Sequence, residues 1–279
     1  MPNITAAATS EKVEKFRRLH TRGAAFLFPN FWDAGSARVL EGVGFAALAS
    51  TSSGFALTKG RADYGVTRAD VMAHAREVCA AVDIPVAADL ENGFGQSPED
   101  CALTIREAAQ TGLCGGSIED STGDEQRPVH EKSAAVDRLA AAAEAARAAP
   151  NGFVLTARAE AFLYGDADLN DVIARLQAFE AAGADVLFAP GLPNLDAVSA
   201  VCSSVSKPVN VLVYGALAKH SVEEFAKAGV ARLSLGGALA FSAYGALVET
   251  ALDIKTSGAF TSLGERRDAM KTVKGVIDG

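Results

Sequence analysis

The sequence predicts a (β/α)8 TIM barrel, in which eight parallel strands alternate with helices, and three observations support this prediction. Short apolar runs of strand length alternate with longer segments of helical periodicity. A length of 279 residues suits one such barrel. A glycine stands just before several of the apolar runs, where a helix is expected to end in a left-handed residue: Gly42, Gly112, Gly183 and Gly229.

Eight apolar runs indicate buried strands. They are residues 24–29, 45–50, 84–89, 114–119, 153–158, 185–190, 208–213 and 230–235. Helical periodicity follows most of them, in residues 34–42, 67–81, 97–110, 131–148, 168–182, 194–205 and 220–228. A charged segment, residues 10–20, predicts a helix before the first strand. An open doubly wound sheet is the alternative, but residues 30–33 contain no glycine-rich phosphate-binding turn.

The C-terminal segment is longer than one barrel helix requires. Residues 238–255 are small and apolar, and residues 264–276 have the periodicity of a further helix. No change in composition and no long linker marks a second domain. We therefore expect residues 1–279 to form one barrel domain. Residues 238–279 are expected to be a helical segment through which copies of the chain form a homo-oligomer, a dimer or tetramer.

The bulk composition restricts the partners of the protein. The formal net charge of -8 argues against nucleic acid and anionic membranes. No apolar run is long enough to span a membrane, and the N-terminal residues contain no apolar signal core. We therefore expect a cytoplasmic protein. The cysteines have neither CxxC nor metal-site spacing, as in a reducing compartment: Cys79, Cys101, Cys114 and Cys202.

Residues 85–95 contain the most informative motif. A short apolar run leads into Asp89 and Glu91, whose side chains can point to the same side because side chains alternate along a strand. Gly93 and Gly95 then allow a tight turn. Two adjacent carboxylates repel each other unless a cation lies between them, and oxygen ligands favour Mg²⁺ or Mn²⁺ over zinc. For this motif alone, an acidic loop that faces water is the alternative.

Polar residues gather where the predicted strands end, which is the active-site end of a barrel. In chain order they are Asn30, Trp32 and Asp33, then Ser50, Thr51, Ser52, Ser53 and Asp63, then Asp89, Glu91, Glu119, Asp120, Arg158, Glu160 and Tyr214. Because neighbouring strand ends converge, the acids of the third and fourth strands predict a metal site with Arg158 beside it.

Several of these residues have ordinary alternatives. Arg158 could be a structural counter-ion of Glu119 or Glu160. Residues 50–54 form either a plain turn or a set of backbone donors for a carboxylate. Trp32 is either a pocket wall or part of the core. No lysine stands at a predicted strand end, which argues against a Schiff-base aldolase.

These motifs resemble those of the isocitrate lyase/phosphoenolpyruvate mutase superfamily over nearly the whole chain. The matching stretches are residues 30–38 (NFWDAGSAR), 49–56 (ASTSSGFA), 88–95 (ADLENGFG), 117–121 (SIEDS) and 156–162 (TARAEAF). The resemblance implies a (β/α)8 barrel whose last barrel helix is swapped between paired subunits of a tetramer. It also implies an enzyme that binds Mg²⁺ and a 2-oxo acid and makes or breaks a C–C or P–C bond beside an enolate.

The resemblance also implies roles for single residues. Asp89 matches the direct metal ligand, and Arg158 matches the residue that binds the substrate carboxylate or the developing enolate. Acids that match those holding the metal, mostly through water, are Asp63, Glu91 and Glu119. Residues that match the loop receiving the substrate carboxylate are Ser50, Thr51, Ser52 and Ser53. We further expect Glu119 to take part in catalysis, and Trp32 and Tyr214 to contact the substrate, a small 2-oxo acid or dicarboxylate.

The loop after the fourth strand departs from the superfamily pattern. Lyases carry a Lys-Lys/Arg-Cys-Gly-His motif there, whose cysteine is the acid/base, and mutases carry Lys-x-Asn-Ser. Residues 121–130 read STGDEQRPVH, with no cysteine. His130 is the candidate acid/base, and a surface histidine at a loop-to-helix junction is the more common alternative. Decarboxylation of oxaloacetate or hydrolysis of phosphonopyruvate ranks ahead of isocitrate or 2-methylisocitrate cleavage with a non-cysteine acid/base. A catalytically silent barrel that binds a 2-oxo acid is the alternative from another class.

Overall fold

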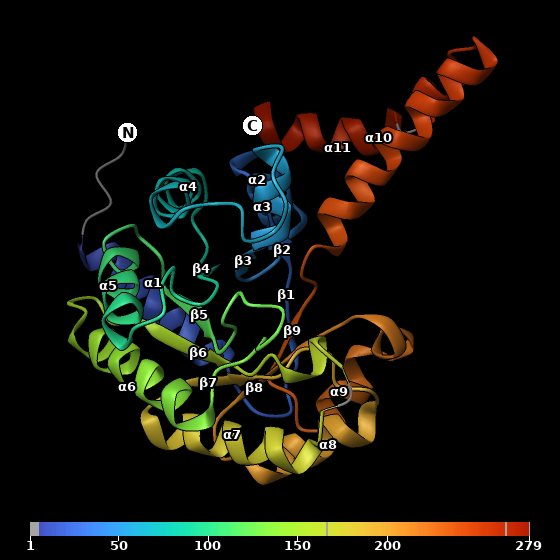
Figure 1. Cartoon of the computed structure of the whole chain (residues 1–279). Coiled ribbons are helices and arrows are strands. Elements are labelled where there is room, and N and C mark those ends of the chain that lie inside the picture. Colours follow the sequence, from blue (N-terminus) through green and yellow to red (C-terminus); the bar gives the residue numbers. More distant parts are fainter. Residues whose placement is uncertain (1–5, 166, 266, 279) are drawn as a thin grey trace.

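Parallel strands form one sheet at the centre of the molecule, and helices surround it (Figure 1). The computed structural model describes residues 6–165, 167–265 and 267–278. Along the sheet the strand order is β1-β9-β8-β7-β6-β5-β4-β3-β2. The strands are β1 Phe26–Phe28, β2 Asn30–Phe31, β3 Leu48–Ser50, β4 Val86–Asp89, β5 Gly115–Glu119, β6 Val154–Arg158, β7 Val186–Phe188, β8 Val209–Leu212 and β9 Arg232–Ser234.

The first barrel strand is divided in two at Pro29. Its first part, β1, pairs with β9, with Phe26 opposite Arg232. Its second part, β2, pairs with β3, with Asn30 opposite Ala49. Proline has no N–H to donate to a ladder, which explains the break. Counting β1 and β2 as one strand gives the predicted eight, and the sheet closes into a barrel apart from this interruption.

The predicted helices are present around the strands, with ends that differ from the prediction by a few residues. They are α1 Ala6–Leu19, α2 Ala34–Val43, α4 Arg68–Ala81, α5 Pro98–Ala108, α6 Lys132–Ala148, α7 Leu169–Ala182, α8 Leu195–Ser204 and α9 Val222–Lys227. Side-chain caps fix several starts: Asp33, Thr67, Ser97 and Ser221 each form a capping box. The predicted β/α alternation is therefore confirmed.

The helix α1 closes one end of the barrel. Its side chains Val13 and Phe16 are buried in an apolar cluster with Cys114, Val154 and Val186, which come from the N-terminal ends of the strands or just before them. A second and larger core lies between the strands and the surrounding helices. Because one end of the barrel is plugged by apolar side chains, a ligand can enter only from the C-terminal ends of the strands.

One of the glycine predictions is wrong. The helix α2 continues past Gly42 and ends at Gly44, which has a φ of 104°. A Cβ at Gly42 would lie 2.4 Å from the Val276 side chain, so the glycine allows a C-terminal helix to pack closely against α2. Gly183 ends α7 in the predicted left-handed conformation, with a φ of 109°. Gly112 and Gly229 also have positive φ, at 99° and 91°.

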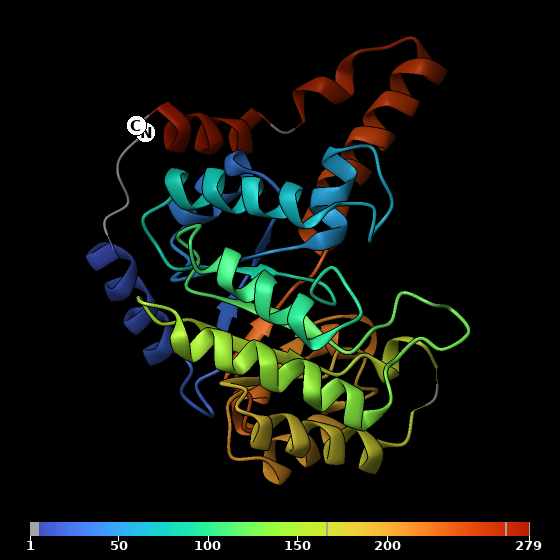
Figure 2. The ribbon, with the colours of Figure 1, turned by 60° about the vertical axis from the view of Figure 1, so that its left-hand side comes forward.

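Two helices follow the barrel, as predicted. The helix α10, Ala238–Ser257, projects away from the strands, and α11, Arg267–Asp278, turns back to pack against α2 (Figures 1 and 2). Of the residues of α10, only Ala240 is fully buried. Large apolar side chains are exposed along it, namely Phe241, Leu247, Val248 and Leu252. Among the described helices, none has the length and apolar character needed to cross a membrane.

Candidate active site

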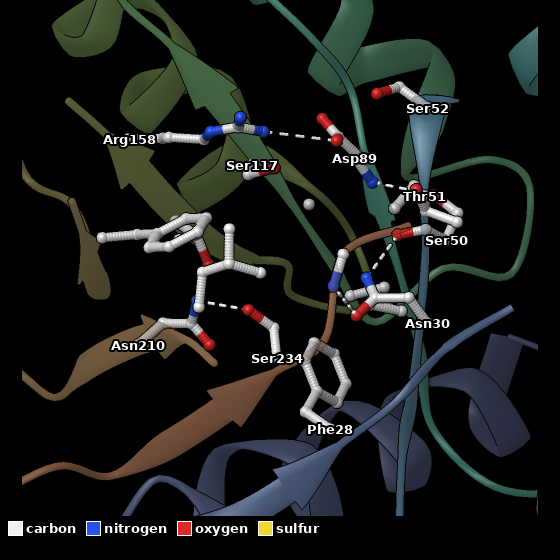
Figure 3. A pocket seen from close by; sticks show the side chains of 18 of the residues that line it. Phe28, Asn30, Ser50, Thr51, Ser52, Asp89, Ser117, Arg158, Asn210 and Ser234 are labelled. Atoms are coloured by element: carbon white, nitrogen blue, oxygen red, sulfur yellow. Dashed lines mark hydrogen bonds and ion pairs between the residues drawn. The ribbon is translucent and has the colours of Figure 1, made fainter. Parts of the chain in front are cut away.

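A cavity of about 190 Å³ opens at the C-terminal ends of the strands. Its lining includes seven of the residues predicted for the site: Ser50, Thr51, Ser52, Ser53, Asp63, Asp89 and Arg158. Figure 3 shows Arg158 and Asp89 facing each other at one end of the cavity, with Asn210, Ser234 and Phe28 toward the other. The barrel thus brings together residues from β3, β4 and β6 that are far apart in the sequence.

The serine-rich segment after β3 begins a short helix that the sequence did not predict, α3 Ser52–Thr58. Thr51 caps this helix by accepting a hydrogen bond from the Gly54 N–H at 3.4 Å. The Ser50 hydroxyl accepts a hydrogen bond of 2.8 Å from the Asp89 N–H, which ties the segment to the end of β4. The predicted turn is therefore the start of a helix, and residues 50–53 line the cavity.

Arg158 lies at the centre of a group of acids. Its guanidinium is 3.3 Å from the Asp89 carboxylate and 3.2 Å from that of Glu119, and it binds Glu160 through both Nε and Nη2. Burial opposes the charge of Arg158, but Glu160, Glu119 and Asp89 together raise its pKa well above the ordinary value. The arginine is therefore protonated at any physiological pH.

Glu119 is almost fully buried at the end of β5. Burial raises the pKa of Glu119 well above its ordinary value, against the opposing effect of Arg158. The hydroxyl of Tyr64, from the loop before α4, donates a hydrogen bond to the Glu119 carboxylate. The non-glycine residue Tyr64 has a φ of 60°, a strained conformation typical of functional loops. The sequence reasoning did not find Tyr64, since nothing in the spacing links residues 64 and 119.

Glu91 is also strained and buried. Its φ is 48°, and its carbonyl accepts a 3.0 Å hydrogen bond from the Glu119 N–H. The Glu91 Oε1 atom is buried and has no hydrogen-bond partner among the described residues. Burial, and then repulsion from Asp89 and Asp63, raises the pKa of Glu91 to about 8. Glu91 does not line the main cavity but a neighbouring groove, together with Tyr64 and Arg68.

The charges within the acid cluster at one end of the cavity do not balance. Two guanidinium groups, Arg158 and Arg175, face six carboxyl groups, which are Asp63, Asp89, Glu91, Glu119, Asp120 and Glu160. Burial and the nearby Asp89 raise the pKa of Asp63 as well. A divalent cation would relieve this repulsion, and the orphaned oxygen of Glu91 would gain a partner.

The donor set fits Mg²⁺ held mostly through water. Within the described part of the chain, no three His, Cys, Asp or Glu side chains are arranged to hold a metal ion directly. Mg²⁺ usually keeps several waters and takes only one or two carboxylates from the protein. A Mg²⁺ ion here would take Asp89, which lines the cavity, as its direct ligand, and the nearby Asp63, Glu91 and Glu119 would hold it through water.

Besides Glu91 and Glu119, which belong to the acid cluster, three predicted residues do not line the cavity. Trp32 is half-buried, with its backbone N–H 3.1 Å from the Ser36 hydroxyl. Tyr214 is 71% exposed. His130 donates its N–H to the Asp120 carbonyl at 2.8 Å, and burial lowers the pKa of its ring below the ordinary value. The structure therefore gives no contact through which these three residues would reach a ligand in the cavity, and their roles stay predictions.

Further polar lining residues were missed because they lie inside the predicted apolar runs instead of at their ends. They are Ser117, Thr156, Asn210, Arg232 and Ser234. Each of the pairs Thr156 and Arg158, and Arg232 and Ser234, has a spacing of two, so both members face the barrel interior. Polar residues at alternate positions of an otherwise apolar strand were the available signal.

The raised pKa of Glu91 predicts how the free energy of unfolding depends on pH. Its carboxyl binds a proton more tightly in the folded state, where the pKa is about 8, than in the unfolded chain, where it is near 4.5. We therefore expect the free energy of unfolding of the metal-free protein to fall as pH rises between these values. The slope from one such group is at most about 1.4 kcal/mol per pH unit. Chemical denaturation of the wild type and of Glu91→Gln measures this, and equal slopes would contradict the assignment.

Comparison with known proteins agrees with this geometry. A profile described as phosphoenolpyruvate phosphomutase matches residues 16–255. The 2-methylisocitrate lyase of Shewanella oneidensis MR-1 is 32% identical over 203 residues, which are 69% of this chain and 68% of that protein. A candidate lyase/mutase from Burkholderia cenocepacia J2315 has a solved structure with a TM-score of 0.89, 48% identity and 93% coverage of both chains.

A more distant structure shares the fold. Phosphonopyruvate hydrolase in complex with oxalate and Mg²⁺ has a TM-score of 0.83 at 21% identity, covering 96% of this chain and 95% of that one. The resemblance predicted from the motifs is confirmed by the profile match and by the lyase. The chain therefore belongs to the isocitrate lyase/phosphoenolpyruvate mutase superfamily and is an enzyme of this group of lyases, mutases and hydrolases.

Proposed function

We propose that this enzyme uses Mg²⁺, or Mn²⁺ in its place, to cleave a C–C or P–C bond of a small 2-oxo acid through an enolate. The observation that carries the proposal is Arg158, a buried and permanently charged guanidinium beside an excess of carboxylates in a small cavity. A cavity of about 190 Å³ suits a small organic acid. The Mg²⁺ and oxalate in the phosphonopyruvate hydrolase structure support the same choice of cofactor and ligand class.

The side chains divide the work between them. A divalent cation at Asp89 would supply Lewis acidity at the ketone of the substrate. Arg158 donates hydrogen bonds to the substrate carboxylate or to the enolate oxygen, whose negative charge grows as the bond to C3 breaks. Three carboxylates already fix the guanidinium in place, so little reorganisation is needed during the reaction. The backbone N–H groups of the loop formed by residues 50–53 receive the carboxylate end of the substrate.

The positions of the four cysteines argue against a thiol as acid/base, the group that lyases of this superfamily use. All four are buried, and none lines the cavity. Burial raises the pKa of Cys79 to about 12 and those of Cys114 and Cys202 to about 11. Decarboxylation or hydrolysis, which needs no thiol, is therefore the better candidate reaction. Cleavage of 2-methylisocitrate with another acid/base is the second candidate, because the Shewanella enzyme has that name.

Turnover distinguishes these reactions from one another and from a silent binding protein. The purified chain is supplied with Mg²⁺, or with a chelator as the control, and with oxaloacetate, phosphonopyruvate, 2-methylisocitrate or isocitrate. We expect Mg²⁺-dependent release of pyruvate or oxalate from oxaloacetate, or of phosphate from phosphonopyruvate. Faster release of glyoxylate from isocitrate, or of pyruvate from 2-methylisocitrate, would reverse the ranking. Oxalate binding without any turnover would support the silent binder.

The exposed face of α10 predicts self-association. Phe241, Val248 and Leu252 have spacings of seven and four residues, which place them on one helix face, and each is more than half exposed. We propose that this face packs against a second copy of the chain in a dimer or tetramer. Light scattering at micromolar concentration should show an oligomer that Val248→Glu dissociates. Ala243→Glu, on the opposite face, is the control, and a monomeric wild type would refute the proposal.

A further inference from the structure

Arg232 is a buried arginine without an acidic partner. It lies on β9 with 4% of its surface exposed. Its Nε donates to the Asn210 amide oxygen at 2.8 Å, its Nη2 donates to the Thr156 hydroxyl at 3.1 Å, and its Nη1 is 3.0 Å from His20 Nε2. Asn210 and Thr156 carry no charge. His20 is neutral as well, because burial, and then Arg232 itself, lowers its pKa to about 3.

The other buried arginines of the described chain are satisfied differently. Arg158 contacts three carboxylates, and Arg175 pairs with Asp120 at 3.2 Å. Arg138 donates to the backbone carbonyls of a loop, which it holds in place. For Arg232, burial lowers the pKa to about 9, and no charged neighbour among the described residues opposes this effect. The guanidinium also lies over the Phe28 ring, 4.8 Å from its centroid, but it contacts no carboxylate among the described residues. A buried cation without an anionic partner is costly, so its presence calls for a reason beyond packing.

The guanidinium of Arg232 borders the same cavity as Asp89 and Arg158. Thr156, which accepts its hydrogen bond, is two residues before Arg158 on β6, so it lies roughly 6–7 Å deeper along the strand. Small residues, Ala49 and Ala87, line the cavity where barrels usually carry bulky branched side chains. The cavity is therefore open between the acid cluster and Arg232.

Two N–H groups of Arg232 have no hydrogen-bond partner among the residues that the structure describes. A guanidinium has five N–H groups, and three are directed at Asn210, Thr156 and His20. At about 1.5 Å per C–C bond, a four-carbon diacid separates its carboxylate carbons by about 4 Å. With a hydrogen bond of about 2.9 Å at each end, such a diacid reaches over roughly 10 Å, which is longer than the roughly 6–7 Å along β6 that separates Thr156 from Arg158.

We propose that Arg232, with Asn210 and Thr156 holding it in place, forms a second anion subsite for a terminal anionic group on the substrate. This proposal rests on the proposed function and narrows its substrate class to 2-oxo acids with an anionic group attached to C3. The anion would supply the negative charge that the described protein side chains do not place beside Arg232.

The charge at this subsite also bears on the reaction. A carboxylate that leaves as CO₂ loses its charge, so a guanidinium bound to it would stabilise the substrate more than the transition state. A phosphonate keeps its charge while the P–C bond breaks. A terminal carboxylate also keeps its charge when water cleaves the bond between C2 and C3 of oxaloacetate, giving oxalate and acetate. The subsite therefore favours hydrolytic cleavage over decarboxylation.

Three non-cleavable probes test the subsite. Malate and 2-hydroxy-3-phosphonopropanoate carry a terminal carboxylate and a terminal phosphonate, and 2-hydroxybutyrate carries a methyl group at the same place. Calorimetry in the presence of Mg²⁺ should show that at least one anionic probe binds about tenfold or more tightly than 2-hydroxybutyrate. The anionic probe that binds more tightly identifies the terminal group. Equal binding of all three probes would overturn the proposal.

Variants then assign the preference to Arg232. Arg232→Met should remove the preference for the anionic probe and leave binding of 2-hydroxybutyrate unchanged, while Arg106→Met, an exposed arginine on α5, should change neither. If Arg232→Met does not fold, Arg232→Lys takes its place. Lysine keeps the positive charge but lacks the planar guanidinium, so this variant should reduce the preference for the anionic probe. A preference for the anionic probe that persists in both variants would contradict the proposal. A preference for the anionic probe without any turnover would support the subsite and refute the proposed reaction. Turnover without that preference would support the reaction and refute the subsite.

Discussion

Replacing Asp89 with asparagine is expected to abolish Mg²⁺ binding and to lower turnover by more than about 100-fold. Substitution of outer groups that only support a metal ligand already costs about 10- to 100-fold, and Asp89 is the proposed direct ligand. Its carboxylate lines the cavity 3.3 Å from Arg158 and also accepts a hydrogen bond from the Glu91 N–H. Asparagine keeps the size of the side chain but removes the charge that holds a hard cation.

Calorimetric titration with Mg²⁺ measures the effect, and Asp137→Asn is the matched control. Asp137 is an exposed residue of α6, outside the cavity, so its substitution should leave both Mg²⁺ affinity and turnover unchanged. Thermal unfolding of both variants shows whether the fold is retained. Unchanged Mg²⁺ affinity in Asp89→Asn would show that Asp89 is not the direct metal ligand.

Replacing Arg158 with lysine is expected to weaken the binding of oxalate by about 1–3 kcal/mol, the usual scale for a lost hydrogen bond to a charged group. Lysine retains the positive charge, but its ammonium cannot reproduce the planar fork that contacts Glu160 through two nitrogens while facing Asp89 and Glu119. The substitution therefore tests geometry more than charge.

Competition with oxalate and with pyruvate in the presence of Mg²⁺ gives the affinities. Arg106→Lys serves as the control, since Arg106 is 46% exposed and pairs with Glu99 on the surface. Should Arg158→Lys bind both ligands as the wild type does, Arg158 would be a structural counter-ion of Glu119 and Glu160, the alternative that the sequence left open.

The fold was largely predictable because its signals are local. An apolar run followed by an amphipathic helix and a glycine repeats along the chain, and β6 and β8 lie within the runs predicted for them. The failures also have local causes. Gly42 has the sequence context of a helix end, but it serves a contact with Val276, more than 200 residues away, which no local pattern reveals. Residues 52–58 are too short and too small for a visible helical period.

The site was predictable where the acids stand at strand ends. The Asp89 and Arg158 pair follows from the rule that barrel chemistry lies at the C-terminal ends of the strands. Tyr64 was not predictable, because a loop conformation with positive φ brings its hydroxyl to Glu119. Arg232 was overlooked because a single arginine inside an apolar strand resembles an exception, and only the closed barrel shows that its guanidinium borders the cavity.

The division of the first strand at Pro29 has a consequence for how the chain acquires its structure during synthesis. Among the described strands, β1 pairs with β9 alone, so Phe26 has no pairing partner until Arg232 has been synthesised. At 5–20 residues per second, a ribosome needs roughly 10–40 s to produce the intervening chain. Throughout that time the edge of β1 has no strand to pair with, and unpaired edges are prone to wrong association. The last strand therefore sets the earliest moment at which the nascent barrel can close.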